Sequence, residues 1–232
     1  MASSAWPIFD PVNELRRIYW DYTQNPSEKT FGILFLCAIM QAYILVSEGE
    51  PSVVAEYTAL VFLTWGAFTN AFHSMVEEAV SDKNLRLHQH FVPFKSTYLF
   101  WIGARGFVSA TVHFVQTMVL VVLNTVWYGP DLLGLVSIWP FVIALFVFGL
   151  ALGMVAATLA YFFEAINLVS GLFSLAGLSA ALAVGGTLSH GADASVSVAW
   201  SAGVLLMAAL LLPLAYLISS QLIGSIHRRL LV

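Results

Sequence analysis

Two histidines in the apolar part of the chain have side chains suited to holding a haem or a metal. His73 lies near the end of an apolar segment at residues 57–76, and His113 lies inside the next one, at residues 106–128. Imidazoles from two neighbouring helices can hold a haem iron, but they can also hydrogen-bond between helices. Two histidines at loosely matched depth are a weak signal for haem. Interhelical hydrogen bonding is therefore the favoured interpretation, and a haem- or quinone-binding electron-transfer subunit is the alternative.

Motifs for nucleotide hydrolysis and for nucleophilic catalysis are not evident. A phosphate-binding loop needs a glycine-rich turn that ends in Lys and Ser or Thr, whereas Lys29-Thr30 follows Asn25-Pro26-Ser27-Glu28. No Gly-x-Ser-x-Gly motif or Ser-His-Asp arrangement accompanies it. We therefore expect a protein that is not an enzyme, with no catalytic residues, metal site or cofactor. Any energy from ATP must come from a partner chain.

Charged side chains concentrate between residues 75 and 105, in the interval that separates two apolar segments. Glu77 to about Leu87 predicts a short helix, Pro93 a break, and Lys95 to Ala104 a helix lying at the membrane surface. A helix–break–helix of mixed charge beside a membrane can act as a docking surface. The alternative is a solvated loop with ordinary charges. The charged residues are Glu77, Glu78, Asp82, Lys83, Arg86, Lys95 and Arg105.

The composition indicates that a bilayer surrounds most of the chain. Of 232 residues, 59% are hydrophobic and only 9% are charged, whereas a soluble domain carries about a quarter charged residues. Six apolar segments are long enough, or nearly so, to cross a bilayer. We therefore predict an all-α polytopic membrane protein with six transmembrane helices. Their approximate ranges are 31–46, 57–76, 106–128, 132–163, 166–188 and 196–223, with Pro140 and Pro213 as candidate kinks.

The basic residues predict the orientation. With six crossings, all 9 Lys and Arg residues fall on one side of the membrane, and that side is normally the cytoplasm. Both termini are then cytoplasmic, and the expected location is the cell membrane. The small net charge of −4 makes nucleic acid an unexpected partner.

Residues 1–30 predict an amphipathic helix that precedes the six-helix domain of residues 31–232. Asp10-Pro11 is a favourable helix start, since a capping carboxylate precedes a proline at the first helical position. An apolar stripe follows at spacings of three and four, which suits a helix lying in the headgroup plane. The alternative is an ordinary amphipathic helix packed on protein. The stripe consists of Ile8, Val12, Leu15, Tyr19 and Tyr22.

Few polar residues lie inside the apolar segments, which argues against a proton relay or an ion filter. Asn70, Gln116 and Asn124 are uncharged, and Glu164 lies at a boundary. Segment four carries Gly149-Leu-Ala-Leu-Gly153, a spacing of small residues that allows close helix packing. That face predicts either a seam between two copies or packing within one chain.

Taken in order, these features resemble the membrane subunit of type-2 ABC transporters, the export-type permease family. The amphipathic amino-terminal helix comes first. The charged interval follows, as Glu77-Glu78, Leu85-Arg86-Leu87, Phe91-Val92-Pro93 and Gly103-Ala104-Arg105. Third is the stretch from Phe148 to Leu175, a Gly/Ala-rich helix, a short turn with the acidic Glu164, and another apolar helix.

The resemblance implies a permease subunit of an ATP-driven exporter. It implies six-helix subunits that pair, as two copies or as two relatives, each docked on a separate cytoplasmic ATPase. In that family the segment between helices two and three, here 77–104, is the coupling helix. The residues that would lie at or near the ATPase contact are Glu77, Glu78, Asp82, Arg86 and Pro93.

Overall fold

A computed structural model describes most of the chain, and within the described ranges the chain forms helices and no strands. These ranges are residues 10–24, 26–84, 95–129, 138–160, 171–179, 181 and 194–230. The helices are α1 (Pro11–Gln24), α2 (Pro26–Val46), α3 (Pro51–Asn84), α5 (Lys95–Thr125), the 3-10 turn η1 (Val126–Tyr128), α6 (Trp139–Leu159) and α8 (Ala194–Leu230). Residues 171–179 are also helical.

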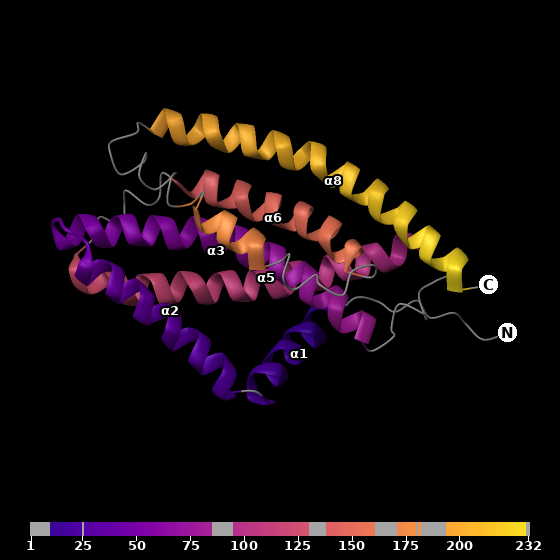
Figure 1. Cartoon of the computed structure of the whole chain (residues 1–232), viewed down its shortest axis with the longest axis horizontal. Helices are drawn as coiled ribbons and strands as arrows, with labels where there is room; N and C mark the ends of the chain where they lie inside the picture. Colours follow the sequence, from indigo (N-terminus) through magenta and orange to yellow (C-terminus); the bar gives the residue numbers. More distant parts are fainter. Residues whose placement is uncertain are drawn as a thin grey trace.

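Helix α3 is the centre of the bundle, because it contacts both α5 and α6 along their lengths. Helix α8 packs on the far side of α6 and forms the outer edge, while α1 and α2 make a V on the opposite side of α3 and α5 (Figure 1). The end of α3 and the start of α5 lie at the same end of the bundle as the end of α8 (Figure 1). The helices therefore form a layered bundle, in which α1 and α2 cover one side only sparsely.

Among the described residues, three helices are long and apolar enough to cross a membrane. They span Pro51–Lys83, Phe100–Tyr128 and Trp139–Leu159. The apolar parts of α2 and α8, Thr30–Val46 and Ala202–Ile218, are shorter. The apolar segments predicted at 31–46, 57–76, 106–128, 132–163 and 196–223 thus all contain a helix, and the segment at 166–188 is helical over residues 171–179.

Glycines on α6 let it pack closely on α3. A Cβ atom built on Gly149 would lie 2.6 Å from the Phe68 carbonyl oxygen, and one on Gly153 would lie 2.9 Å from Met75 Cβ. Such distances are below van der Waals contact, so only glycine fits between these two backbones. The small-residue face of segment four therefore packs within the chain, which was one of its two predicted roles.

Helix ends agree with the sequence in one case and correct it in another. The Asp10 carboxylate accepts a hydrogen bond from the Val12 amide at 2.9 Å, so Asp10 caps α1 as predicted. Pro140 does not kink a longer helix, because α6 begins at Trp139 and Pro140 lies in its first turn. Pro213 does lie inside α8.

The predicted surface helix at Lys95–Ala104 does not end at Arg105. It continues without interruption as α5, from Lys95 to Thr125. At Gly106 the α3 backbone passes so close that a Cβ atom would lie 3.3 Å from Met75 Cα. A glycine at this position therefore lets the two helices approach each other. The expected break at Pro93 lies outside the described residues.

Candidate functional site

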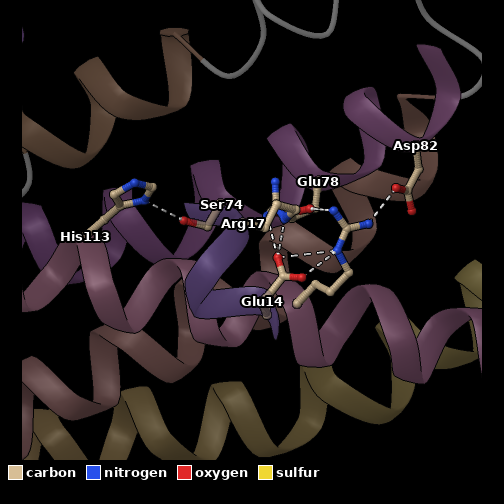
Figure 2. A network of polar contacts seen from close by, with 7 residues as sticks. Glu14, Arg17, Ser74, Glu78, Asp82 and His113 are labelled. Carbon is tan, nitrogen blue, oxygen red and sulfur yellow. Dashed lines mark hydrogen bonds and ion pairs between the residues drawn. The ribbon is translucent and has the colours of Figure 1, made fainter. Parts of the chain in front are cut away.

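Charged side chains from three helices meet where α1 crosses α3 and α5. We call Glu14 and Arg17 of α1, Glu78 and Asp82 of α3, and Arg105 of α5 the ion cluster (Figure 2). Arg105 Nη1 donates to Asp82 Oδ1 at 2.7 Å, its Nη2 lies 2.6 Å from Glu78 Oε2, and its Nε lies 3.4 Å from Glu14 Oε2. A single guanidinium thus joins α5 to both other helices.

Arg17 closes the cluster from the α1 side. Its Nε donates to Glu14 Oε1 at 2.6 Å, and its Nη2 donates to Glu78 Oε1. Burial of the Arg17 guanidinium opposes its charge, but the hydrogen bond to Glu14 and the charges of Glu78 and Glu14 outweigh burial. The pKa of Arg17 is consequently raised above its ordinary value. Arg17 therefore remains protonated wherever its carboxylate partners are ionised.

Four of the five ion-cluster residues are almost completely removed from solvent, whereas the Arg17 side chain is 41% exposed. Glu14 is 8% exposed, Glu78 and Arg105 are 4% exposed, and Asp82 is fully buried. Buried ion pairs seldom add much net stability, but removing one partner leaves a costly unpaired charge. The cluster already carries three carboxylates for two guanidinium groups, and Asp82 Oδ2 has no hydrogen-bond partner among the described residues. Such an arrangement fixes how the helices are placed more than it raises their stability.

A polar seam continues from the ion cluster along the contact between α3 and α5. Ser74 Oγ lies 3.3 Å from His113 Nδ1 (Figure 2), and Asn70 Nδ2 donates to Thr117 Oγ1 at 2.9 Å. Together with Glu78 and Arg105, these residues are four positions apart on α3 and four or eight positions apart on the antiparallel α5. The recurrence places them on one face of each helix.

An open groove of 580 Å³ lies beside this seam, between α2, α3 and α5. We call it the α2 groove. Its α3 and α5 walls are mainly polar, and its α2 wall is mainly apolar. The residues that line it are Phe31, Gly32, Ile33, Leu36, Asn70, His73, Ser74, Glu77, His113, Gln116, Thr117 and Leu120.

A smaller pocket of 180 Å³ lies where the groove approaches α1, and it shares Glu77 and His113 with the groove. Arg17, Asp21 and Glu78 also line it. The α2 groove therefore reaches the edge of the ion cluster.

Helix α1 faces the bundle with Glu14 and Ile18 and leaves most of its predicted apolar stripe exposed. Glu14 and Ile18 are buried, whereas Val12, Leu15 and Tyr19 are 54%, 48% and 67% exposed. We call these last three residues the α1 stripe. An amphipathic helix packed on protein would bury this stripe, so the geometry favours the membrane-surface interpretation over the protein-packed alternative.

The predicted docking residues occupy different surroundings. Glu77 is exposed, while Glu78 and Asp82 are buried in the ion cluster. Arg86 and Pro93, together with the acidic Glu164 of the predicted inner turn, lie outside the described residues. Contact of this set with an ATPase stays a prediction, and the burial of Glu78 and Asp82 leaves Glu77 as the carboxylate on the surface.

The two histidines each contact a serine on another segment. His73 Nε2 hydrogen-bonds with Ser174 Oγ, and His113 Nδ1 with Ser74 Oγ. These contacts are of the interhelical kind that the sequence favoured. Within the described ranges, no three His, Cys, Asp or Glu side chains are arranged to hold a metal ion.

Sequence reasoning did not identify Glu14, Arg17 and Arg105 as parts of one site. Glu14 and Arg17 are one turn apart, and each can reach the same neighbour. That spacing was a usable signal, since a charged face opposite the α1 stripe must contact either water or other charges. Lys83 was likewise not assigned a contact, and its Nζ donates to the Ala160 carbonyl at the end of α6, at 3.0 Å.

Comparison with known proteins gave no match: no protein-family description, characterised protein or solved structure is similar enough to this chain to be counted. The fold and the site thus define the protein only by class, as an all-helical chain whose long apolar helices are compatible with a membrane.

Proposed function

We propose that this chain is the membrane permease subunit of an ATP-driven exporter. In this proposal six helices cross the cell membrane with both termini in the cytoplasm, and the segment at 77–104 receives a separate cytoplasmic ATPase. A second permease subunit, a copy or a relative, completes the translocation path. The order of motifs in the sequence supports this class, and the ion cluster supports its mechanism.

The observation that carries the proposal is the position of the ion cluster. Glu78 and Asp82 lie within the predicted docking segment at 77–104 and Arg105 directly follows it, and the ion cluster joins all three to α1. Arg105 contacts carboxylates of both other helices, so the three helix ends are tied together. A force applied to the segment between α3 and α5 would reach α1 and the bundle through these ion pairs.

Helix α1 can transmit such a force between the membrane surface and the helices α3 and α5. Its α1 stripe faces away from the protein, where it can enter the headgroup region of the bilayer. Its opposite face holds α3 and α5 through Arg17 and Glu14. In the proposal α1 lies at the membrane surface and is bound to the ends of α3 and α5, which move during transport.

The proposal is tested first by isolating the chain with its partner. The tagged chain is expected to co-purify from mild detergent with a protein that carries a nucleotide-binding loop. The reconstituted pair should hydrolyse ATP faster than the ATPase alone. If the chain purifies from its native membrane without an ATPase, and no ATPase encoded beside it is stimulated, the proposal is wrong.

Two charge reversals then separate docking from internal packing. Glu77→Lys alters an exposed carboxylate, so we expect lost stimulation of the ATPase with normal thermal stability. Glu78→Lys disrupts the ion cluster, so both properties should fall. The matched control is Glu50→Lys, an exposed carboxylate just before α3 at the other end of that helix. Full stimulation in the Glu77→Lys variant would contradict docking at this residue.

A further inference from the structure

The α2 groove has the two-sided character of a site for an amphiphile. One wall offers hydrogen-bonding groups of α3 and α5, among them Glu77, His113 and Gln116. The opposite wall is apolar and includes Ile33 and Leu36 of α2. Its volume of 580 Å³ falls within the range of small-molecule sites, about 300–1,000 Å³.

The charge of the groove favours a cation. Among the described residues that line the groove, Glu77 is the one that is an acid or a strong base. Among the described residues that line the adjoining pocket, the acids Asp21, Glu77 and Glu78 outnumber the base Arg17, although Glu78 also pairs with Arg105. A positive group near Glu77 would thus reduce an excess of negative charge, and an amine could donate a charge-assisted hydrogen bond to this carboxylate.

The depth of the groove orients the ligand. Glu77 precedes Glu78 in α3, and Glu78 accepts a hydrogen bond from Arg17 of α1. The end of the groove that contains Glu77 therefore lies at the level of α1. Leu36 and Leu120 lie further along α2 and α5, away from the ion cluster. A ligand with its head at Glu77 and its tail along these leucines would lie parallel to the helices, as a membrane lipid does.

We propose that the α2 groove binds a single-chain amphiphile with a cationic amine headgroup, whose head is held by Glu77 and whose chain lies against α2. As a binding site this inference stands independently of transport. As an entrance for exported cargo it rests on the proposed function, and it then assigns amphipathic amines as the class of cargo.

The test uses the full chain in lipid nanodiscs and photoreactive probes that differ only in the headgroup. Dodecylamine with a diazirine in its chain is compared with the matching alcohol and carboxylic acid. We expect saturable labelling by the amine, mapped by mass spectrometry to α2 and α5 around Ile33, Leu36 and Leu120. Affinity should fall from amine to alcohol to acid.

Two variants test the head and the cavity separately. Glu77→Gln removes the charge at nearly constant shape, so amine affinity should fall roughly tenfold while alcohol affinity stays the same. Gly32→Phe places a ring where a Cβ has nothing within 4 Å, so it should fill the groove without disturbing the fold and block all three probes.

Each variant has a matched control. Glu50→Gln neutralises an exposed carboxylate outside the groove, and Gly203→Phe enlarges a glycine of α8 that also has open space. Both should bind like the unchanged chain. The inference is overturned if labelling is unsaturable and spread over all lipid-facing helices, or if Glu77→Gln leaves the preference for amine over alcohol unchanged. Because no ATPase is present, these outcomes do not depend on whether the transport proposal holds.

Discussion

Arg105 is the residue on which the ion cluster depends. Its guanidinium contacts Asp82, Glu78 and Glu14 and lies 4.3 Å from the centre of the Trp101 ring. A planar guanidinium can serve several carboxylates at once, which an ammonium group does less well. Because these carboxylates are buried, they rely on Arg105, and Glu14 and Glu78 also on Arg17, where a surface carboxylate would rely on water.

We predict that Arg105→Met destabilises the protein by about 3–5 kcal/mol, because it leaves Asp82 and Glu78 buried with less opposing charge. Thermal unfolding in detergent micelles measures this as a large fall in Tm. Arg105→Lys should lie in between, since it keeps the charge but loses the fork geometry.

The matched control is Arg16→Met on α1. Arg16 is exposed, and its side-chain contact within the described ranges is a long hydrogen bond, 3.5 Å, to Asn13. A surface change of this kind is usually worth less than about 0.5 kcal/mol. Equal Tm values for Arg16→Met and Arg105→Met would show that the ion cluster does not hold the helices together.

At this scale the sequence predicted residue types better than residue partners. The charges at Glu78, Asp82 and Arg105 were recognised as a concentration, but not as one cluster with Glu14. Glu14 and Arg105 are 91 positions apart, and no local spacing relates them. Their contact is decided by how α1 crosses α3 and α5, which is a property of packing.

At the scale of elements, the spacing of apolar residues and the residue types at helix ends predicted helix α1 correctly. The α1 stripe follows from spacings of three and four, and Asp10 caps the helix as its side chain suggests. The continuity of α5 through Arg105 did not follow, because two glycines and a change from polar to apolar residues resemble a boundary. Gly106 instead permits a close approach to Met75, and the helix runs on.

The contact between α3 and α6 supplies the second prediction. Gly149→Ala would place a methyl group 2.6 Å from the Phe68 carbonyl oxygen and 2.9 Å from Ala71 Cβ. Neither neighbour can rotate away, so the helices must separate. We expect a loss of about 1–3 kcal/mol, typical of an overpacked core, measured as a lower Tm in detergent.

Gly203→Ala in α8 is the control for this prediction. It makes the same chemical change in a helix interior, where an added Cβ has nothing within 4 Å. Alanine favours a helix over glycine, by about 0.5–1 kcal/mol in soluble helices, so Tm should stay equal or rise. A Gly149→Ala variant as stable as Gly203→Ala would contradict the close packing of α6 on α3.

At the scale of the whole molecule, the basic residues and the fold are consistent with each other. The end of α3 and the start of α5 lie at one end of the bundle with the end of α8 (Figure 1), and these elements carry Lys83, Lys95, Arg105, Arg228 and Arg229. An even number of crossings keeps all of these on one side of a membrane. The sequence predicted this arrangement, but the number of crossings depends on α2 and α8, whose apolar parts are short, and on residues 166–188, which are described only at 171–179 and 181.

The crossing of α2 is therefore the decisive step in the topology. The helix has 21 residues, enough for about 30 Å at 1.5 Å per residue, although its apolar part, Thr30–Val46, is shorter. If α2 crosses, Arg16 and Glu50 lie on opposite sides of the membrane. If it does not, they lie on the same side.

Single cysteines tested with a membrane-impermeant maleimide distinguish these cases. The one native cysteine, Cys37, is first replaced by serine. We expect Glu50→Cys and Trp127→Cys to react in intact cells, because both positions are exposed and lie at the outer end of the bundle in the proposed topology. Arg16→Cys and His227→Cys should react only after the cells are permeabilised. If positions 16 and 50 both react in intact cells, α2 does not cross. If positions 50 and 227 both react, an even number of crossings separates them, and this result contradicts the cytoplasmic carboxyl terminus of the proposal.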